Sequence, residues 1–275
     1  MRSFPMVLVI ACLALVTFAP GSDGVTASVP GAGTVKEVRA TSNPDWFLII
    51  GDSISFDSSL VTKQKSGHNI WPYLLEEMLR SRGRPWSVED TACPGETSWT
   101  YVGTCLLQSA VPLLASGVSQ RDAALRTIRQ HHTMPRFIVV ELGTNDIYYQ
   151  QRDNREILDS LHQFDANLSD ILDQLAGVAP NVPLIVANIY DYLGNLSPDY
   201  LSPVELFDAD IAAVVYRHQA WLADFYSAIE APPHTRANFC KNIDCAHSDI
   251  HPTAQGHEQL ARSVMDALRR AKVIA

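Results

Sequence analysis

Positive charge is scarce in this sequence, and it is not clustered. Lysine and arginine together number 21, against 30 aspartate and glutamate residues, and the formal net charge is −9 at pH 7. Proteins that bind nucleic acid or anionic membranes need a basic patch that meets the phosphates. We therefore expect neither nucleic acid nor an anionic membrane as a partner of this chain.

Long apolar runs are missing beyond the N-terminal region. A membrane-spanning helix needs about 20 apolar residues, and no apolar stretch after residue 19 approaches that length. The N-terminal apolar stretch, residues 4–19, follows Arg2 and precedes small and polar residues that end in Ala27. This order is that of a secretory signal peptide, with cleavage after Ala27. We expect a secreted, extracellular protein without a stable membrane anchor. Its net charge stays at −9, because residues 1–27 contain one Arg and one Asp.

Cysteine is also sparse, and no pair of cysteines has the CxxC spacing typical of zinc sites. Outside the signal peptide there are four, Cys93, Cys105, Cys240 and Cys245. An even number of cysteines in an exported chain indicates disulfides. Three pairings are possible, and the most local one joins Cys93 to Cys105 and Cys240 to Cys245. Closing the first loop would stabilise the fold by roughly 3 kcal/mol in the chain-entropy model.

Internal repeats, low-complexity tracts and shifts of composition are absent. Residues 45–275 are therefore expected to form a single domain, preceded by a loose leader at residues 28–44. Within this domain, apolar β-prone runs alternate with runs of helical periodicity. We expect strands at residues 46–50, 86–90, 137–142 and 182–189, and helices at residues 71–80, 106–132, 154–175, 205–229 and 253–270. Strands that alternate with helices predict an α/β fold, a three-layer doubly wound parallel sheet.

Residues suited to catalysis follow the ends of three expected strands. Ser53 lies in a Gly-Asp-Ser turn, Gly95 in a Cys-Pro-Gly-Glu-Thr stretch and Asn145 in a Gly-Thr-Asn-Asp stretch. The carboxyl ends of parallel strands meet at one edge of the sheet, where ligands bind. His251 stands directly before Pro252 and the last helix. Ester hydrolysis by a serine needs a nucleophile, a base, a group that orients the base and donors for the oxyanion, and the sequence offers a candidate for each.

These four blocks, in this order from residue 51 to residue 252, resemble the GDSL-type, or SGNH, hydrolase superfamily. The Cys-Pro-Gly-Glu-Thr stretch, with a cysteine a dozen residues on, resembles its secreted, largely actinobacterial-type branch. The resemblance implies a flavodoxin-like strand order, 2-1-3-4-5. It also implies Ser53 as nucleophile and His251 as base. The oxyanion donors would be the backbone N–H groups of Ser53 and Gly95 and the side-chain amide of Asn145.

The block around His251 departs from the family pattern. The family places its acid three residues before the histidine, but Ser248 occupies that position here and Asp249 lies two residues before. One possibility, which we favour, is that Asp249 reaches His251 from a tighter turn and completes a Ser-His-Asp triad. The other is a Ser-His dyad in which a backbone carbonyl near Ser248 holds the ring, because a carbonyl can fix the tautomer without supplying charge.

Two further features near these blocks have structural interpretations. His247, His251 and His257 could be read as a metal cluster, but their spacing crosses a proline and the start of a helix. We therefore expect no metal. Asp146, which follows Asn145, is expected to cap a helix rather than to take part in catalysis.

The sequence thus predicts a secreted serine esterase or lipase that hydrolyses small-molecule or polymeric carboxylic esters through an acyl-enzyme, as a monomer and without metal or cofactor. A carbohydrate O-acetylesterase is the alternative among enzymes, since the same blocks serve acyl chains and acetylated sugars. A catalytically silent carbohydrate- or lipid-binding module on the same fold is the alternative of another class. Trp99 and Tyr101, beside Gly95, either line an acyl or sugar pocket or shield the disulfide loop from solvent.

Overall fold

The computed structural model describes residues 44–56, 69–105, 117–153, 156–192, 203–230, 235–247 and 249–275. The chain divides into two units, residues 1–42 and residues 43–275, and all of the described residues belong to the second. The expected signal peptide and almost all of the leader at residues 28–44 lie outside the described residues. So do residues 106–116 of an expected helix, and Ser248.

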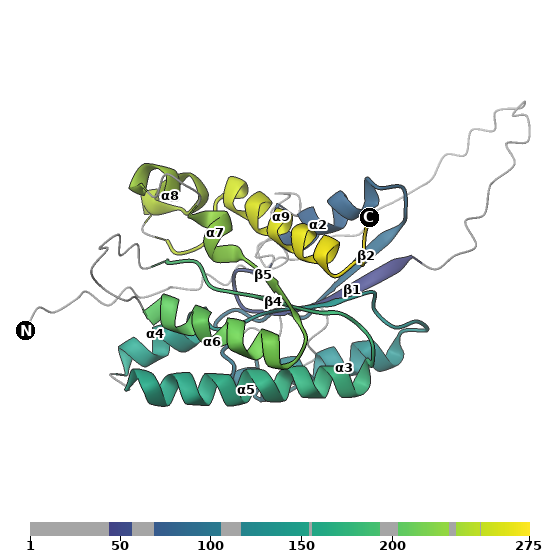
Figure 1. Ribbon diagram of the computed structural model, residues 1–275, viewed down its shortest axis with the longest axis horizontal. Coiled ribbons are helices and arrows are strands. Elements are labelled where there is room, and N and C mark those ends of the chain that lie inside the picture. The colour runs from purple at the N-terminus through teal and green to yellow at the C-terminus, as the bar shows by residue number, and fades with distance from the viewer. Residues whose placement is uncertain are drawn as a thin grey trace, which may run out of the picture. The chain divides into compact units, whose positions relative to one another are not determined.

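Five parallel strands form one sheet in the order β2-β1-β3-β4-β5 (Figure 1). Their bounds are β1 Asp45–Gly51, β2 Trp86–Asp90, β3 Ile138–Glu141, β4 Leu184–Ala187 and β5 Trp221–Ala223. In register, Leu48 of β1 lies opposite Glu89 of β2 and Ile138 of β3. The direction of winding reverses between β1 and β3, which makes this pair the switch point of the sheet. The expected fold class is confirmed, and so is the strand order that the family resemblance implies.

Helices cover both faces of the sheet and give the fold three layers (Figure 1). One layer holds α2 Trp71–Arg80, α7 Phe225–Ile229, α8 Arg236–Asn242 and α9 Ala254–Arg270, and the other holds α3 Gln120–Gln130, α4 Thr144–Arg152, α5 Ile157–Val178 and α6 Pro203–Arg217. Successive residues of β1 serve opposite layers: Phe47 and Ile49 pack in one core cluster, and Leu48 and Ile50 in the other. Because both faces are covered, the strand is a continuous apolar run rather than an alternating one.

The helix expected at residues 205–229 is wrong, because a strand interrupts it. The first part, α6, ends at Arg217, β5 follows, and the last residues form α7. Gln219 makes the break with a φ of 53°, in the left-handed region that glycine usually occupies after a helix. Asp224 then caps α7 by accepting a backbone N–H at 3.0 Å. No glycine or proline marks this break and β5 has only 3 residues, so the helical periodicity hides the strand.

The connections near the carboxyl edge hold the remaining elements. Two short 3₁₀ helices, η1 Thr100–Val102 and η3 Cys245–His247, lie in the segments that carry the cysteines. Both local disulfides are present, Cys93–Cys105 and Cys240–Cys245. The helix expected at residues 106–132 is seen as α3 in its described part, and α4 and α8 do not stand out in the sequence. Within the described ranges, no helix is long and apolar enough to cross a membrane.

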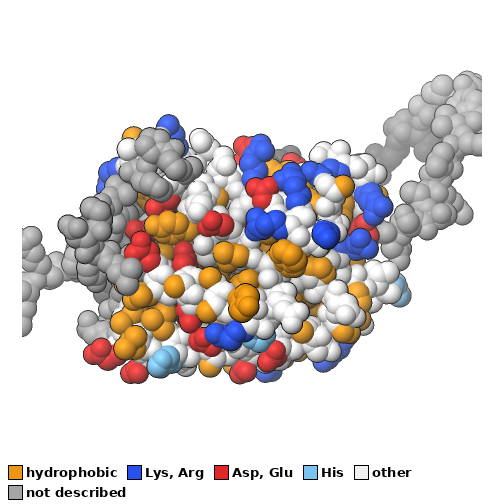
Figure 2. All heavy atoms as spheres, viewed as in Figure 1, with side chains coloured by type: hydrophobic (Ala, Val, Ile, Leu, Met, Phe, Trp, Pro, Cys, Tyr) orange, Lys and Arg blue, Asp and Glu red, His pale blue; other side chains and the backbone are white. Residues whose placement is uncertain are grey.

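Surface charge is less evenly spread than the sequence suggests. On the face shown in Figure 2, Lys and Arg side chains gather towards the C-terminus, over α2 and the end of α9. Arg84 and Arg136 both approach Asp45, the first residue of β1. Because Ser53 follows the opposite end of β1, this basic region lies at the amino edge of the sheet, away from Ser53.

Candidate active site

Ser53 is held in a tight turn directly after β1. Asp52 Oδ1 accepts the backbone N–H two residues on at 2.8 Å, the kind of local bond that fixes such turns. Packing requires a glycine at position 51, because a Cβ there would lie 2.5 Å from Ser55 Oγ. That hydroxyl donates to Glu141 of β3 at 2.7 Å. The turn is therefore pinned to the neighbouring strand, and it leaves Ser53 half-buried at the carboxyl edge.

His251 meets Ser53 at this edge. Its Nε2 lies 2.9 Å from Ser53 Oγ, so the serine hydroxyl can donate to a neutral ring. The segment around His251 is fixed by two bonds from elsewhere in the fold. The Asp244 N–H donates to the His251 carbonyl at 3.1 Å, and Tyr190 OH donates to the Ile250 carbonyl at 2.9 Å. The ring thus reaches Ser53 from a supported backbone.

Asp249 contacts the other side of the same ring. Its Oδ1 lies 2.5 Å from His251 Nδ1 and also accepts the His251 backbone N–H at 3.1 Å. The spacing of two residues suffices because the carboxylate folds back over the backbone that follows it. Burial opposes the charge on Asp249, but the hydrogen bond and charge of His251, with two backbone N–H groups, outweigh it and lower the pKa of Asp249 below its ordinary value. Ser248, whose neighbourhood is the other candidate orienter, lies outside the described residues.

Gly95 occupies a turn that only glycine fits well. Pro94 and Gly95 are the central residues of a turn closed by the Glu96 N–H and the Cys93 carbonyl at 3.1 Å. The φ of Gly95 is +80°, as the third position of a type II turn demands. A Cβ on Gly95 would meet nothing within 4 Å, so conformation and not space selects glycine here. In such a turn the N–H of this residue does not close the turn, which leaves it available to a substrate.

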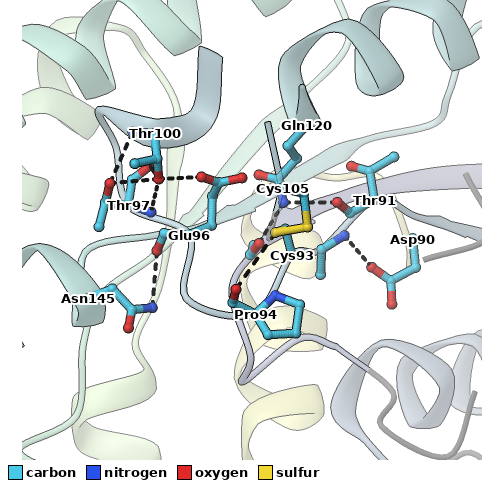
Figure 3. The surroundings of a disulfide bond; sticks show 12 residues. Asp90, Thr91, Cys93, Pro94, Glu96, Thr97, Thr100, Cys105, Gln120 and Asn145 are labelled. Atoms are coloured by element: carbon cyan, nitrogen blue, oxygen red, sulfur yellow. Dashed lines mark hydrogen bonds between the residues drawn. A yellow bond between two sulfur atoms is a disulfide. The ribbon is translucent and has the colours of Figure 1, made fainter. Parts of the chain in front are cut away.

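The Gly95 turn is tied to the Ser53 turn through the ends of β1 and β2. The Cys93 N–H donates to the Gly51 carbonyl at 2.9 Å. Gln120, buried at the start of α3, bridges the two strand ends, since its Nε2 donates to the Gly51 and Thr91 carbonyls at 2.7 and 2.8 Å. Figure 3 shows this amide beside the Cys93–Cys105 disulfide. Nothing in the sequence around Gln120 signals this role.

Asn145 joins three of the blocks. Its Nδ2 donates to Asp52 Oδ2 at 2.9 Å and to the Glu96 carbonyl at 3.0 Å; Figure 3 shows the second of these bonds. A primary amide has two N–H donors, so both are used in this state. An oxyanion that binds Asn145 must therefore compete with one of these acceptors. The backbone carbonyl is the weaker competitor, because a bond to a carboxylate is charge-assisted.

Two buried carboxyl groups lie beneath Ser53, and neither was singled out in the sequence analysis. Asp52 and Glu141 are 0% and 4% exposed, and the Asp52 N–H approaches Glu141 Oε2 at 3.3 Å. Burial raises the pKa of Asp52 to about 6. Burial and the neighbouring Asp52 raise the pKa of Glu141 well above its ordinary value. Burial thus favours the protonated form of Glu141, and the Asp52 carboxylate accepts the bond from Asn145. The one available signal was an acid at the end of an otherwise apolar strand.

Three other residues near these blocks differ in their surroundings. Asp146 accepts the Ser98 N–H at 3.0 Å and the Ser98 hydroxyl at 2.6 Å. It therefore ties α4 to the segment that carries Gly95. A helix cap, the role expected from the sequence, would not by itself make these contacts. Tyr101 is 1% exposed and belongs to the core, which excludes it from a surface pocket. Trp99 is 43% exposed and lines a cavity of about 340 Å³ together with Gly95.

The three histidines considered for a metal site have different surroundings. His247 contacts Asp244 at 2.8 Å, His251 contacts Ser53 and Asp249, and His257 is buried in α9. Among the described residues, no group of three histidine, cysteine or acidic side chains could hold a metal ion.

Comparison with protein families gives one match. A sequence model of the GDSL-like lipase/acylhydrolase family matches residues 49–259, a range that includes Ser53, Asn145 and His251. None of the curated proteins that were searched matches the chain in sequence.

Several solved structures share the fold. TesA is 20% identical, the match covers 84% of this chain and 100% of TesA, and the TM-score is 0.51. LAE5, an alpha/beta hydrolase enzyme from the metagenome of Lake Arreo, Spain, is 16% identical over 81% of this chain and 94% of its own, with a TM-score of 0.59. Axe2, an acetylxylan esterase from Geobacillus stearothermophilus, is 14% identical over 82% of this chain and 94% of its own, with a TM-score of 0.58. At such identities the likeness is one of fold.

Proposed function

Because this chain belongs to the GDSL-like lipase/acylhydrolase family and is a carboxylic ester hydrolase, we propose that it cleaves its substrate through an acyl-enzyme on Ser53, without metal or cofactor. The observation that carries the proposal is the 2.9 Å contact between Ser53 Oγ and His251 Nε2. A serine hydroxyl is a weak nucleophile until an adjacent base takes its proton. This contact supplies the base, and a silent binding module would have no use for it.

The reaction follows from the contacts of His251. Nε2 takes the proton of Ser53 Oγ as the oxygen attacks the ester carbonyl, and Asp249 stabilises the imidazolium that forms. When the tetrahedral intermediate collapses, Nε2 gives that proton to the leaving alcohol. Water then repeats the sequence on the acyl-enzyme: it loses a proton to Nε2 and adds to the carbonyl, and Ser53 Oγ leaves with the proton as the acid forms.

The oxyanion of each intermediate is assigned three donors. They are the backbone N–H groups of Ser53 and Gly95 and the Nδ2 of Asn145. In this assignment Asn145 keeps its bond to Asp52, which fixes the plane of the amide, and exchanges the Glu96 carbonyl for the oxyanion. A donor of this kind contributes a factor of about 10²–10³ to kcat.

Export is part of the proposal. Residues 1–27 would be removed as a signal peptide, residues 28–44 would form a leader, and residues 45–275 would act as a single catalytic domain and as a monomer. The two disulfides support an oxidising location, since disulfides persist in exported proteins. N-terminal sequencing of protein exported by a host should give Ser28 as the first residue. An N-terminus that retains residues 1–27 would contradict this processing.

The test of the function is a substrate panel with and without Ser53. The wild type should hydrolyse p-nitrophenyl esters in a series from acetate to palmitate, or an acetylated xylan assayed in parallel, and Ser53→Ala should abolish the activity while the circular dichroism spectrum is retained. Activity in Ser53→Ala close to that of the wild type would refute the acyl-enzyme on this residue. The panel also separates a lipase from a carbohydrate O-acetylesterase.

A further inference from the structure

Asp52 directly precedes Ser53, and its side chain is completely buried. Its two carboxylate oxygens have different partners. Oδ1 accepts the Ile54 N–H at 2.8 Å, and Oδ2 accepts Asn145 Nδ2 at 2.9 Å. One short side chain therefore joins the turn that carries the proposed nucleophile to the side chain of a proposed oxyanion donor.

The turn alone does not explain a carboxylate at position 52. A buried charge is costly unless hydrogen bonds compensate it. An asparagine or a serine side chain also accepts the backbone N–H two residues on, and neither carries a charge. The second oxygen makes the difference. Towards Asn145, an asparagine would present a donor and a serine would have no further oxygen, whereas aspartate accepts on both sides.

A second carboxyl group supports Asp52 from the neighbouring strand. Glu141, the last residue of β3, accepts the Asp52 N–H at 3.3 Å and the Ser55 hydroxyl at 2.7 Å. A hydrogen bond also joins the side chains of Glu141 and Asp52. The chain continues from β3 into α4, whose second residue is Asn145. Asp52 is thus fixed both to the turn after β1 and to the segment after β3.

The bond to Asp52 determines which end of the Asn145 amide reaches the substrate. If the amide turned over, its oxygen would face the Asp52 carboxylate and the Glu96 carbonyl, which Nδ2 now binds at 2.9 and 3.0 Å. Acceptors that face each other repel, and the oxyanion would also meet an oxygen instead of an N–H. In the proposed reaction the Glu96 carbonyl is exchanged for the oxyanion. The bond to Asp52 then holds Nδ2 in place while the negative charge develops.

From these contacts, we propose that Asp52 is a positioning residue of the reaction: one oxygen fixes the turn of Ser53, and the other directs the Asn145 amide at the oxyanion. The inference rests on the proposed function, because it needs Asn145 as an oxyanion donor. Asp52 does not touch the substrate and acts on the rate through Asn145. An experiment can measure this dependence, which a role confined to the turn would not produce.

A double-mutant cycle is the test. kcat and KM for p-nitrophenyl acetate are measured in the wild type, Asp52→Asn, Asn145→Ala and the double variant. In Asp52→Asn the side-chain oxygen still accepts the Ile54 N–H, but the new NH₂ group faces Asn145 and displaces its amide. We expect kcat to fall about 10-fold to 100-fold with a smaller change in KM, since most of one oxyanion donor is lost. In the Asn145→Ala background the same substitution should lower kcat less than about threefold, because residues that act as a unit are not additive.

Asp224→Asn is the matched control. Asp224 makes the same two kinds of bond as Asp52, since it accepts the Ser227 N–H at 3.0 Å and Asn188 Nδ2 at 3.1 Å. It makes them at the start of α7, after β5, and not in the turn of Ser53. The kcat of Asp224→Asn should therefore stay within about threefold of the wild-type value, whereas a general sensitivity to the loss of such a carboxylate would lower both variants alike.

Asp52→Ser is the second variant, to be used in the cycle if circular dichroism shows that Asp52→Asn does not fold. Its hydroxyl can accept the Ile54 N–H but leaves no oxygen for Asn145. Losses that multiply in the double variant would overturn the inference, because Asp52 would then act independently of Asn145. So would wild-type kinetics in Asp52→Asn, or the failure of both variants to fold. These results leave the proposed function intact, since that function is judged by Ser53→Ala and Asn145→Ala alone.

Discussion

Replacing Asp249 with asparagine tests how His251, the proposed base, is oriented. Oδ1 of Asp249 serves two N–H groups of His251, the backbone amide at 3.1 Å and Nδ1 at 2.5 Å. In Asp249→Asn the side-chain oxygen can keep both bonds, because the backbone N–H selects the oxygen over the amide nitrogen. The ring then keeps the tautomer with a proton on Nδ1 and a lone pair on Nε2. What the variant loses is the negative charge.

The size of the loss follows from the exposure of the pair. Two unit charges about 4 Å apart attract by about 1 kcal/mol in water and about 4 kcal/mol at an effective dielectric constant of 20. The side chains of His251 and Asp249 are 40% and 46% exposed, so solvent screens the pair and the value lies between these limits. Asp249→Asn should therefore lower kcat by about 5-fold to 10³-fold, at 1.36 kcal/mol per factor of ten. This is less than the ~10⁴-fold loss known for a change that also imposes the wrong tautomer.

The assay is the steady-state hydrolysis of one ester by three variants. His251→Ala should be more damaging than Asp249→Asn, because it removes the base itself. Asp244→Asn is the matched control: Asp244 also binds a histidine, His247, through Nδ1 at 2.8 Å, but this pair does not touch Ser53. Its activity should equal that of the wild type. Two results would refute the reasoning. Near-normal activity in Asp249→Asn would leave a Ser-His dyad, and a loss as large as that of His251→Ala would mean that the tautomer is not retained.

Two further predictions concern the groups under Ser53. Asn145→Ala should lower kcat by about 10²–10³-fold with a smaller change in KM, as for the loss of an oxyanion donor; kinetics within threefold of the wild type would place Asn145 outside the site. Glu141→Gln should change how stability depends on pH. Burial raises the pKa of Glu141 well above its ordinary value. At a pH above that ordinary value, the folded protein therefore holds a proton that the unfolded chain has lost. The unfolding free energy of the wild type thus falls as the pH rises. Glu141→Gln has no carboxyl group at this position, so its stability lacks this dependence on pH. The unfolding free energy of the variant minus that of the wild type, measured by urea denaturation, should therefore be greater at pH 8 than at pH 5. A difference that does not vary with pH would contradict the raised pKa of Glu141.

The position of the candidate site residues could be predicted because topology determines it. Ser53, Gly95 and Asn145 each follow a strand, and parallel strands bring their carboxyl ends to one edge. Whether Asp249 can reach His251 was open in the sequence, since it depends on how the side chain folds over its own backbone. The local disulfides followed from loop length, although the sequence allowed other pairings.

Other features could not be predicted, for two physical reasons. The strand β5 is too short to show a period of its own, and Gln219 adopts a left-handed conformation that sequence patterns assign to glycine. The roles of Glu141 and Gln120 come from contacts between residues far apart in the chain, with separations of 86 and 69 residues. A buried polar side chain at the end of a strand or the start of a helix gives no sequence signal of the partner it meets.

The most direct test of the central claim is covalent labelling of the nucleophile. A fluorophosphonate probe, which reacts with activated serines, should label the wild-type protein once, and peptide mapping should place the label on Ser53. Labelling should disappear in Ser53→Ala and slow strongly in His251→Ala, because the base that activates the hydroxyl is gone. A label on any other serine, or a fully active enzyme that the probe neither labels nor inhibits, would contradict catalysis through an acyl-enzyme at Ser53.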